Sequence, residues 1–267
     1  MKPPRADRDI RDGANASPTP PNTRDFACAT WNVHRGRGRD GRVDPERIAR
    51  VLIGDVLAEP LDVLALQEAD AECPPHAGIL DIGAIEAATG LRHAHPERAL
   101  RWGDESHGFL GSILFVAPHV KVEAAAIIDL PGHCHRGAVV LELAAGEARL
   151  RVIGTHLSLG QPLRAVQMRV IGQHLRRGPA LPTVILGDLN EWRPWGGMAL
   201  SKAMLGRAFS GPVRATFPAT RPILPLDRIL CDRKGAVHHV AVLDSPGIRE
   251  ASDHRPLRAR IRLDAAS

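Results

Sequence analysis

Residues 183–190 read Thr-Val-Ile-Leu-Gly-Asp-Leu-Asn. The apolar run at 183–186 predicts a short buried strand, and Asp188 and Asn190 follow it directly. The same pattern, an apolar run that ends in a polar side chain, occurs earlier at Asn32, Glu68 and His156. Ligand sites often gather on the loops that follow strands at one end of packed sheets. These polar residues are therefore expected to share one site.

The rest of the chain alternates short β-like runs with a few helical stretches. A helix is expected to begin at Asp44-Pro45-Glu46, because Asp caps helices and Pro tolerates the first helical position. Further helices are predicted at 82–89, where Gly90 follows, and at 163–176. The predicted strands cover residues 26–33, 61–67, 112–116, 120–128, 138–143, 149–157, 183–186, 226–231, 237–243 and 256–263. This excess of strands, with hairpins and crossovers mixed, favours sheets packed face to face with helices outside.

Composition indicates a globular protein but does not identify its binding partner. A chain of 267 residues can bury a full-sized core as one large domain or two small ones. Aromatic residues are only 3 % and there is no Tyr, so the core must rest on aliphatic side chains. The net charge of +5 suits nucleic acid, anionic lipid or small phosphates equally well. An Arg-rich genome composition explains the same charge without any anionic partner.

The cysteines and the N-terminal segment indicate a reducing compartment. Four cysteines lie far apart, without a CxxC spacing, which favours free thiols. His133-Cys134-His135 lacks a matching second pair of ligands, so zinc is not expected there. Residues 1–25 predict a disordered leader without a secretion signal, and residues 26–267 a single domain without a membrane span. We expect a cytoplasmic protein, with peripheral attachment to the inner membrane left open, and nothing demands a dimer.

Each polar motif has an ordinary explanation when it is taken alone. Glu68 suits a solvated strand end, and His156 suits a half-buried histidine whose hydrogen bonds are satisfied. Asp188 and Asn190 are both common turn formers. The order in which these motifs follow one another is much harder to obtain by chance.

Taken together, the motifs resemble those of the endonuclease/exonuclease/phosphatase superfamily, the fold of DNase I and of abasic-site endonucleases. The matching segments are Thr30-Trp31-Asn32-Val33, Leu66-Gln67-Glu68, Gly154-Thr155-His156-Leu157, Gly187-Asp188-Leu189-Asn190, Leu226-Asp227-Arg228-Ile229 and Ser252-Asp253-His254-Arg255-Pro256-Leu257. They fall in the family order over nearly the whole chain. The resemblance implies an α/β fold, a four-layer sandwich in which two mixed β-sheets pack face to face and are flanked by helices.

The resemblance also implies a divalent metal, Mg²⁺ or Mn²⁺, with Glu68 as its principal ligand. Asn32 resembles the asparagine beside that ligand, and Asp253 resembles a second carboxylate near the metal. A hard cation of this kind prefers oxygen ligands and keeps several waters, so one or two carboxylates suffice.

The catalytic roles come from the same resemblance. Asp188 resembles the residue that orients or deprotonates the attacking water, and Asn190 resembles a donor to a phosphate oxygen. His254 resembles the histidine that contacts the scissile phosphate, with Asp227 fixing its other ring nitrogen. His156 resembles a second group that contacts phosphate or transfers a proton. The implied reaction is hydrolysis of a phosphate ester by in-line attack of water at phosphorus.

Four further residues are candidates for substrate binding. His34 and Arg35 follow Asn32 closely, although a plain solvent-facing loop explains them as well. Arg136 precedes a predicted strand and suits an anion contact. Arg164 resembles a helix-borne arginine of the family, and its alternative explanation is packing between helix and sheet.

The substrate stays open between two classes. The segment Thr216-Phe217-Pro218-Ala219 resembles an uncharacterised bacterial branch of the superfamily, some of whose members are encoded near phospholipid synthesis enzymes. That favours a phosphodiesterase or phosphatase acting on a small or lipid-linked phosphate. The alternative is a nuclease acting on DNA or RNA, although the chain lacks the tyrosine that abasic-site endonucleases use. Trp192 and Trp195 suit either the edge of a substrate cleft or a cover for the core.

Overall fold

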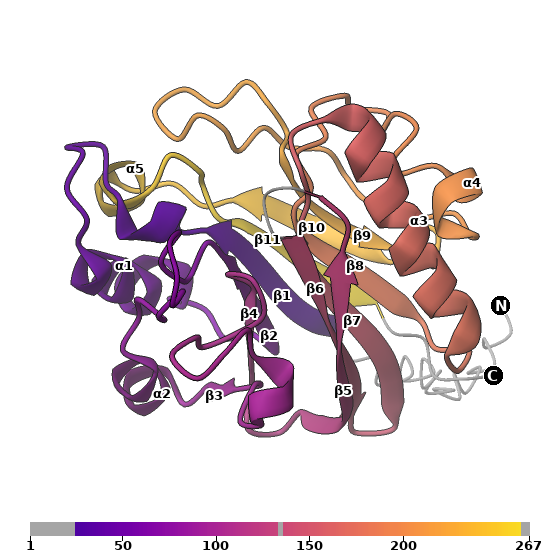
Figure 1. Cartoon of the computed structure of the whole chain (residues 1–267), viewed down its shortest axis with the longest axis horizontal. Coiled ribbons are helices and arrows are strands. Elements are labelled where there is room, and N and C mark those ends of the chain that lie inside the picture. Colours follow the sequence, from indigo (N-terminus) through magenta and orange to yellow (C-terminus); the bar gives the residue numbers. More distant parts are fainter. Residues whose placement is uncertain (1–24, 133–135, 263–267) are drawn as a thin grey trace, which may run out of the picture.

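The computed structural model describes residues 25–132 and 136–262, and Figure 1 shows two sheets between layers of helices. The strands are β1 (Asp25–Asn32), β2 (Val63–Gln67), β3 (Arg92–His93), β4 (Ile113–Val116), β5 (Lys121–Leu130), β6 (Arg136–Ala145), β7 (Ala148–His156), β8 (Thr183–Asp188), β9 (Asp227–Cys231), β10 (Val237–Val242) and β11 (Leu257–Arg262). The helices are α1 (Pro45–Val51), α2 (Ile82–Thr89), α3 (Gln161–Arg177), α4 (Lys202–Leu205) and α5 (Pro246–Ala251). The predicted leader and the segment around Cys134 lie outside the described residues.

Helix ends follow the signals in the sequence. Asp44 accepts a hydrogen bond from the backbone N–H of Arg47 at 2.9 Å and so caps α1, which begins with Pro45. A π-helical segment, Leu52–Val56, continues α1. Gly90 ends α2 in the left-handed conformation that glycine adopts most easily.

Each sheet combines parallel and antiparallel pairs. The first sheet has the strand order β10-β11-β1-β2-β4-β3, and β1 and β2 are its parallel pair. The second has the order β5-β6-β7-β8-β9, and β7 and β8 are parallel. Because parallel strands end at the same edge, the residues that follow β1 and β2, and those that follow β7 and β8, lie together.

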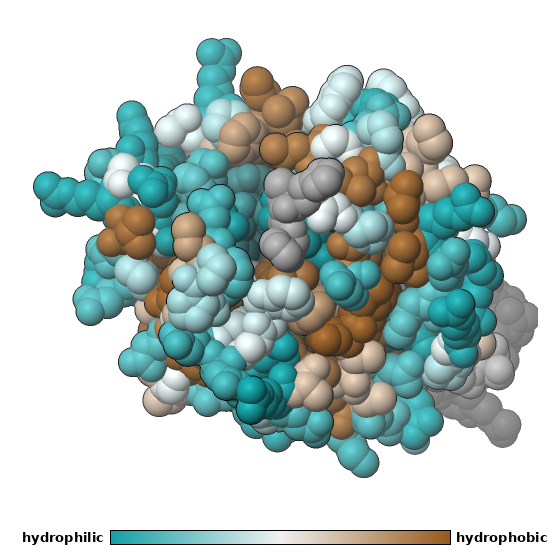
Figure 2. All heavy atoms as spheres, in the orientation of Figure 1, coloured by the Kyte–Doolittle hydropathy of each residue, from teal (hydrophilic) through white to brown (hydrophobic). Residues whose placement is uncertain are grey.

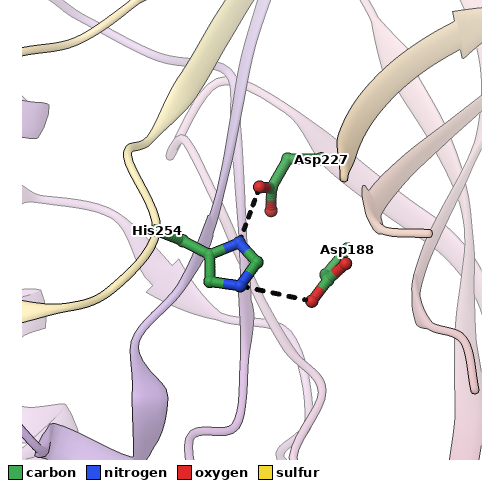
Figure 3. A group of neighbouring side chains, drawn as sticks. All are labelled: Asp188, Asp227 and His254. Atoms are coloured by element: carbon green, nitrogen blue, oxygen red, sulfur yellow. Dashed lines mark hydrogen bonds and ion pairs between the residues drawn. The ribbon is translucent and has the colours of Figure 1, made fainter. Parts of the chain in front are cut away.

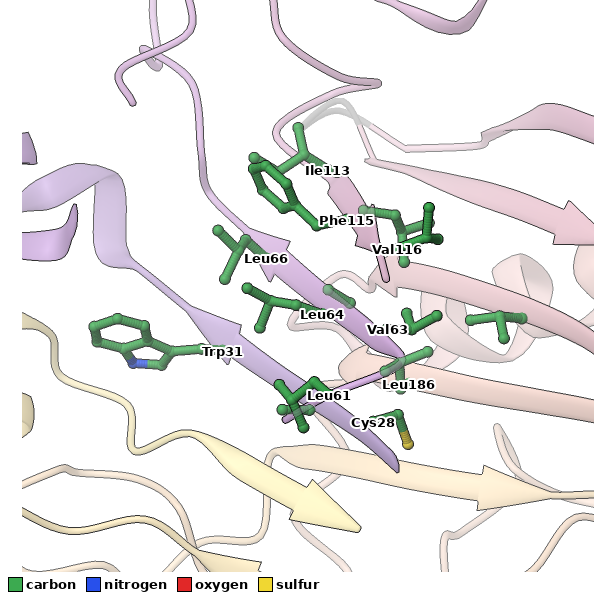
Figure 4. Packing of buried hydrophobic residues seen from close by; sticks show 14 of the residues in the cluster. Cys28, Trp31, Leu61, Val63, Leu64, Leu66, Ile113, Phe115, Val116 and Leu186 are labelled. Atoms are coloured by element: carbon green, nitrogen blue, oxygen red, sulfur yellow. The ribbon is translucent and has the colours of Figure 1, made fainter. Parts of the chain in front are cut away.

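The apolar core fills three interfaces between four layers. Side chains of β1, β2 and β4 belong with Leu186 of β8 to one apolar cluster that covers both faces of the first sheet (Figure 4). Ile48 of α1 and Ile85 of α2 extend this cluster over the first sheet. A second cluster joins Met168 and Ile171 of α3 to the outer face of the second sheet. The predicted sandwich of two mixed sheets flanked by helices is therefore confirmed.

The predicted strands all occur, with ends shifted by a few residues. Among the described strands and α-helices, β3, α4 and α5 were not predicted. None of the helices in the described ranges is long and apolar enough to cross a membrane.

Candidate active site

The register of the second sheet places three candidate residues side by side. His156, the last residue of β7, pairs with Asp188, the last residue of β8. Asp188 pairs in turn with Asp227, the first residue of the antiparallel strand β9. The sheet therefore presents His156, Asp188 and Asp227 in one row at the end of its strands.

His254 lies between the two aspartates of this row (Figure 3). Its Nδ1 is 2.8 Å from Oδ2 of Asp227, and its Nε2 is 3.7 Å from Oδ2 of Asp188. The hydroxyl of Thr216 donates to the same Asp227 oxygen at 2.6 Å. The indole N–H of Trp31 donates to the backbone carbonyl of His254 at 2.9 Å, which fixes the histidine from behind.

These contacts shift the protonation of the group. Burial works against a charged His254, but the carboxylates of Asp227, Asp188 and Asp253 outweigh burial and raise its pKa to about 10. Burial likewise opposes ionisation of Asp188, yet His156, His254 and Asn32 hold its pKa below its usual value. Burial raises the pKa of Asp227 above its usual value, although the contact with His254 and the hydrogen bond from Thr216 act against this rise. The structure thus holds the His254 ring between the side chains of two aspartates.

His156 and Asn190 close the other side of Asp188. The Nε2 of His156 is 3.3 Å from Oδ2 of Asp188. The side-chain amide of Asn190 donates to the carbonyl of Leu157 at 2.8 Å and lies 3.3 Å from Nε2 of His156. The backbone N–H of Asn190 donates to Oδ1 of Asp188 at 3.0 Å. Both oxygens of Asp188 are therefore engaged.

Asn32 joins the first sheet to the second. Its Nδ2 lies 3.0 Å from Oδ2 of Asp188 and 3.4 Å from Oε1 of Glu68. Its Oδ1 accepts the backbone N–H of His34 at 2.9 Å. Asn32 thus presents its amide nitrogen to the two carboxylates and its amide oxygen to the loop that follows β1.

Glu68 is an ionised carboxylate at the edge of the site. Burial raises its pKa, but the neighbouring charges of His156, Arg35 and Arg136 and the Asn32 hydrogen bond bring the pKa below its usual value. Nη1 of Arg35 binds its Oε2 at 2.6 Å. The structure therefore brings the substrate-binding candidates Arg35 and Arg136 within electrostatic reach of Glu68.

Two other candidates lie on the open side, and one lies inside. Oδ1 of Asp253 is 3.6 Å from Nδ1 of His34, and both side chains are partly exposed. Arg164 is buried, and it donates to the carbonyls of Ser158 and Leu159. Arg164 is thus bound to the loop that follows β7.

Backbone strain concentrates on the site. Among the described residues, seven non-glycine residues have a positive φ, and four of them are site candidates: His34 (48°), Arg35 (50°), Glu68 (56°) and Asn190 (50°). Non-glycine residues seldom adopt this region, and such strain persists only where the surroundings enforce it. The loops that follow β1, β2 and β8 thus hold their side chains at a conformational cost.

Gly187 is required for the close approach of β7 and β8. Its φ is 144°, and an added Cβ would collide with the carbonyl of Thr155. Glycine therefore allows the strand to deliver Asp188 beside His156.

Two groups of side chains can be compared as candidate metal sites. Among the described residues, Asp188, Asp227 and His254 place one ligand atom each within 4.8 Å of one another. Both nitrogens of His254 face carboxylates, however, so this histidine has no lone pair to offer while it is protonated. Glu68 and Asp253 offer carboxylate oxygens instead, and Oδ1 of Asp253 is buried and accepts no hydrogen bond. Such hard oxygen donors suit Mg²⁺ or Mn²⁺.

Several supporting residues were missed from the sequence. Ser252 accepts the N–H of His254 at 3.1 Å and donates to the carbonyl of Asn32 at 2.7 Å, so it joins two site loops. Glu191 is fully buried although it directly follows Asn190. Thr216 belonged to a quoted segment, but its bond to Asp227 spans a loop and only the fold reveals it.

Comparisons with known proteins agree with this fold. A family model described as "Endonuclease/Exonuclease/phosphatase family" matches residues 29–254. A structure of an endonuclease/exonuclease/phosphatase from Bacteroides vulgatus aligns with a TM-score of 0.68 at 15 % identity, covering 90 % of this chain and 100 % of that one. The human Nocturnin catalytic domain with bound sulfate anion aligns with a TM-score of 0.64 at 20 % identity, covering 90 % and 94 %.

A third solved structure, D. rerio TDP2 complexed with single strand DNA product, aligns with a TM-score of 0.62. Its identity is 17 %, and the alignment covers 88 % of this chain and 98 % of that one. No curated protein matches the sequence. At these identities the structural likeness establishes the fold alone.

Proposed function

The chain belongs to the endonuclease/exonuclease/phosphatase family, and from that premise we propose that it hydrolyses phosphate esters with water and a divalent metal ion. The observation that carries the proposal is the convergence of three groups on one buried carboxylate oxygen. Nδ2 of Asn32, Nε2 of His156 and Nε2 of His254 lie 3.0, 3.3 and 3.7 Å from Oδ2 of Asp188. Convergent donors of this kind suit a tetrahedral anion.

The proposed reaction uses these groups in turn. A substrate phosphate that enters the site takes the place of Asp188 as the acceptor for the His156 and His254 rings. Oδ2 of Asp188 is then free to accept a proton from water as the water oxygen bonds to phosphorus. The ester P–O bond on the opposite side breaks, and the departing alkoxide takes up a proton from bulk water. His254 keeps its proton because Asp227 holds Nδ1 at 2.8 Å, so it donates from Nε2 to a phosphate oxygen. Asn190, tied to Leu157 and beside His156, sits where a further donor to phosphate is needed.

Glu68 and Asp253 would hold the metal ion, with Asn32 keeping Glu68 in place. The donor set fits a hard cation, because both residues offer carboxylate oxygens and one of these is buried without a hydrogen bond. The chemistry that Mg²⁺ or Mn²⁺ supplies when bound is positive charge beside the phosphate oxygens. Arg35 now neutralises Glu68 at 2.6 Å, and its guanidinium is placed to turn toward an anionic substrate instead.

The first test is hydrolysis of bis-p-nitrophenyl phosphate with Mg²⁺ or Mn²⁺, beside a sample treated with EDTA. We expect turnover that EDTA abolishes and that Glu68→Gln, Asp188→Asn and His254→Gln each lower by at least about 100-fold. Turnover that survives in Asp188→Asn and His254→Gln would refute the site assignment. Full turnover in EDTA would refute the metal.

A nuclease is the second candidate, and two observations favour it. The net charge is +5, and the structurally similar D. rerio TDP2 is complexed with a DNA product. A panel of substrates separates the two candidate functions, with each substrate assayed for both wild type and Asp188→Asn. The panel contains plasmid DNA, abasic-site duplex, single strands, RNA, inositol phosphates and phospholipids. Cleavage of nucleic acid that Asp188→Asn abolishes would select the nuclease.

A further inference from the structure

Exposed apolar side chains cluster in one part of the chain. Of the eight large apolar residues exposed in the described ranges, six lie between positions 159 and 223: Leu159, Val166, Trp192, Trp195, Met198 and Ile223. The most prominent are Leu159, Trp195 and Ile223, with exposed fractions of 79 %, 76 % and 68 %. Single exposed apolar residues need no explanation, but a gathered set marks an interaction site.

We call His156, Asp188 and Asp227 the catalytic row. The exposed apolar residues lie on the loops next to it in the sequence. Leu159 follows β7, which ends at His156. Trp192, Trp195 and Met198 follow β8 and its Asp188, and Ile223 precedes β9 and its Asp227. We call Leu159, Trp192, Trp195, Met198 and Ile223 the apolar rim. Apolar surface is visible at the top of Figure 2, where Figure 1 shows the loops before β9 and the start of α3.

Buried arginines hold the rim loops in fixed positions. Arg164 of α3 binds the carbonyls of Ser158 and Leu159 through Nη1, and its Nη2 is 3.4 Å from Oε2 of Glu191. Arg164 and Glu191 are 1 % and 0 % exposed. The loop that carries Leu159 is thus bound to the loop that carries the two tryptophans.

A second buried arginine connects the third loop. Arg228 donates to the carbonyl of Pro225 at 2.8 Å and to those of Glu191 and Arg193 at 3.0 and 2.9 Å. The loop before β9 is therefore bound to the same segment. A rim fixed in this way presents its side chains without a large loss of conformational entropy on binding.

Apart from Glu191, which is buried and ion-paired with Arg164 and Arg193, the charged residues of the loop after Asn190 and of the loop before β9 are basic. From residue 192 to residue 226 the sequence holds five basic residues and no acidic one: Arg193, Lys202, Arg207, Arg214 and Arg221. The preceding stretch from 148 to 187 likewise contains no Asp or Glu. Arg214 and Arg221, on the loop that carries Ile223, are exposed. Positive charge beside exposed apolar side chains complements a partner whose interior is apolar and whose outer surface is anionic.

We propose that the apolar rim docks on a lipid bilayer with anionic headgroups, so that the catalytic row faces phosphate esters at that surface. The use of the docked site rests on the proposed function. Tryptophan prefers the bilayer interface, and aliphatic side chains gain from insertion below it. Nucleic acid fits less well, because Leu159, Met198 and Ile223 lack the aromatic faces on which bases stack.

The test measures co-sedimentation of the full chain with vesicles made of equal parts phosphatidylglycerol and phosphatidylcholine. The variant combines Leu159→Ser, Trp195→Ser and Ile223→Ser, and the control is Ile53→Ser, whose exposed apolar side chain lies on the π-helical segment after α1. We expect wild type and control to bind, and the triple variant to bind about 100-fold more weakly, because three apolar side chains no longer insert. Its thermal midpoint and its turnover of bis-p-nitrophenyl phosphate should match those of wild type.

Each other outcome has a definite meaning. A wild-type chain that fails to bind these vesicles overturns the docking proposal, whatever its activity. Equal vesicle binding by the triple variant also overturns it. Loss of single-stranded oligonucleotide binding in the triple variant, without vesicle binding by wild type, assigns the rim to nucleic acid instead. Vesicle binding that depends on the rim in a chain without phosphoesterase activity leaves docking intact and rejects the proposed function.

Discussion

The row of His156, Asp188 and Asp227 lies at the end of the second sheet, whereas a groove lies between β3 and β5, and the two regions differ in how their buried polar groups are paired. The groove has a volume of about 700 Å³ and is lined by residues that include Arg92, His93, His119 and Lys121. Another hollow, of about 290 Å³, lies beside the catalytic row and is lined in part by His34 and Asp253. The larger hollow therefore lies away from the residues with catalytic geometry.

Two buried histidines make the difference concrete. His254 meets carboxylates on both ring nitrogens, and its pKa rises to about 10. His95 packs behind the groove, accepts the N–H of Leu114 at 3.1 Å and lies 3.2 Å from the carbonyl of Leu100. Burial dominates there and lowers its pKa to about 3. Burial, with the nearby charges of His93 and Arg101, thus lowers the pKa of His95, whereas the carboxylates around His254 raise its pKa despite burial.

The largest effect on turnover is expected from a substitution in the catalytic row, compared with substitutions in the groove. Asp188→Asn removes the carboxylate on which three donors converge, so we expect turnover to fall by about 10²–10⁴-fold. Arg92→Ala and Lys121→Ala, in the groove, should leave turnover of a soluble phosphodiester unchanged. Steady-state assays of all three variants check this. A groove variant that lost activity as severely would move the site to the groove.

Gly187→Ala should give the next largest effect. The added Cβ collides with the carbonyl of Thr155, and alanine also resists the φ of 144°. We expect a loss of about 2–4 kcal/mol in the free energy of unfolding, since backbone strain and local rearrangement add. Gly54→Ala is the matched control, because a Cβ there meets nothing within 4 Å. Urea denaturation of both variants measures the difference, and equal stabilities would contradict the assigned role.

The fold could be predicted from the sequence because its main strands each have a recognisable local pattern of residues. Buried strands such as β8 are continuous apolar runs, and polar residues mark where they end. β3 has only two residues and α4 has four, so neither carries a periodic signal. The site residues could be identified by their resemblance to family motifs, whereas their contacts could not. The bond between Thr216 and Asp227 and the burial of Glu191 depend on how distant loops pack.

The two histidines predict opposite responses of stability to pH. The folded-state pKa of His254 lies above the usual 6.5, so its stabilisation is full below pH 6.5 and is lost as pH rises toward about 10. The folded-state pKa of His95 lies below 6.5, so its stabilisation is full above pH 6.5 and is lost as pH falls toward about 3. His254→Gln should flatten the alkaline limb and His95→Gln the acid limb. Denaturant unfolding measured across pH 4–10 tests both, and a variant that flattens the wrong limb would refute its assignment.

The smallest expected effect compares the two ends of the second sheet. Thr216 donates to Asp227 at 2.6 Å beside His254, whereas Thr183, at the start of β8, donates to the carbonyl of Leu181 at 3.0 Å. Thr183→Val removes one hydrogen bond, and Thr216→Val removes the bond to the Asp227 carboxylate together with a longer one, at 3.4 Å, from the Asp227 backbone N–H. Each substitution should cost about 1 kcal/mol of stability. Only Thr216→Val should also lower kcat, by about tenfold, because Asp227 then holds Nδ1 of His254 less firmly. The pH profile of kcat distinguishes this positioning role from a general loss of stability: in Thr216→Val the alkaline limb of the profile should move, and in Thr183→Val it should stay where it is in wild type. Equal kcat losses in the two variants would mean that the Thr216 hydroxyl serves the fold and not the histidine.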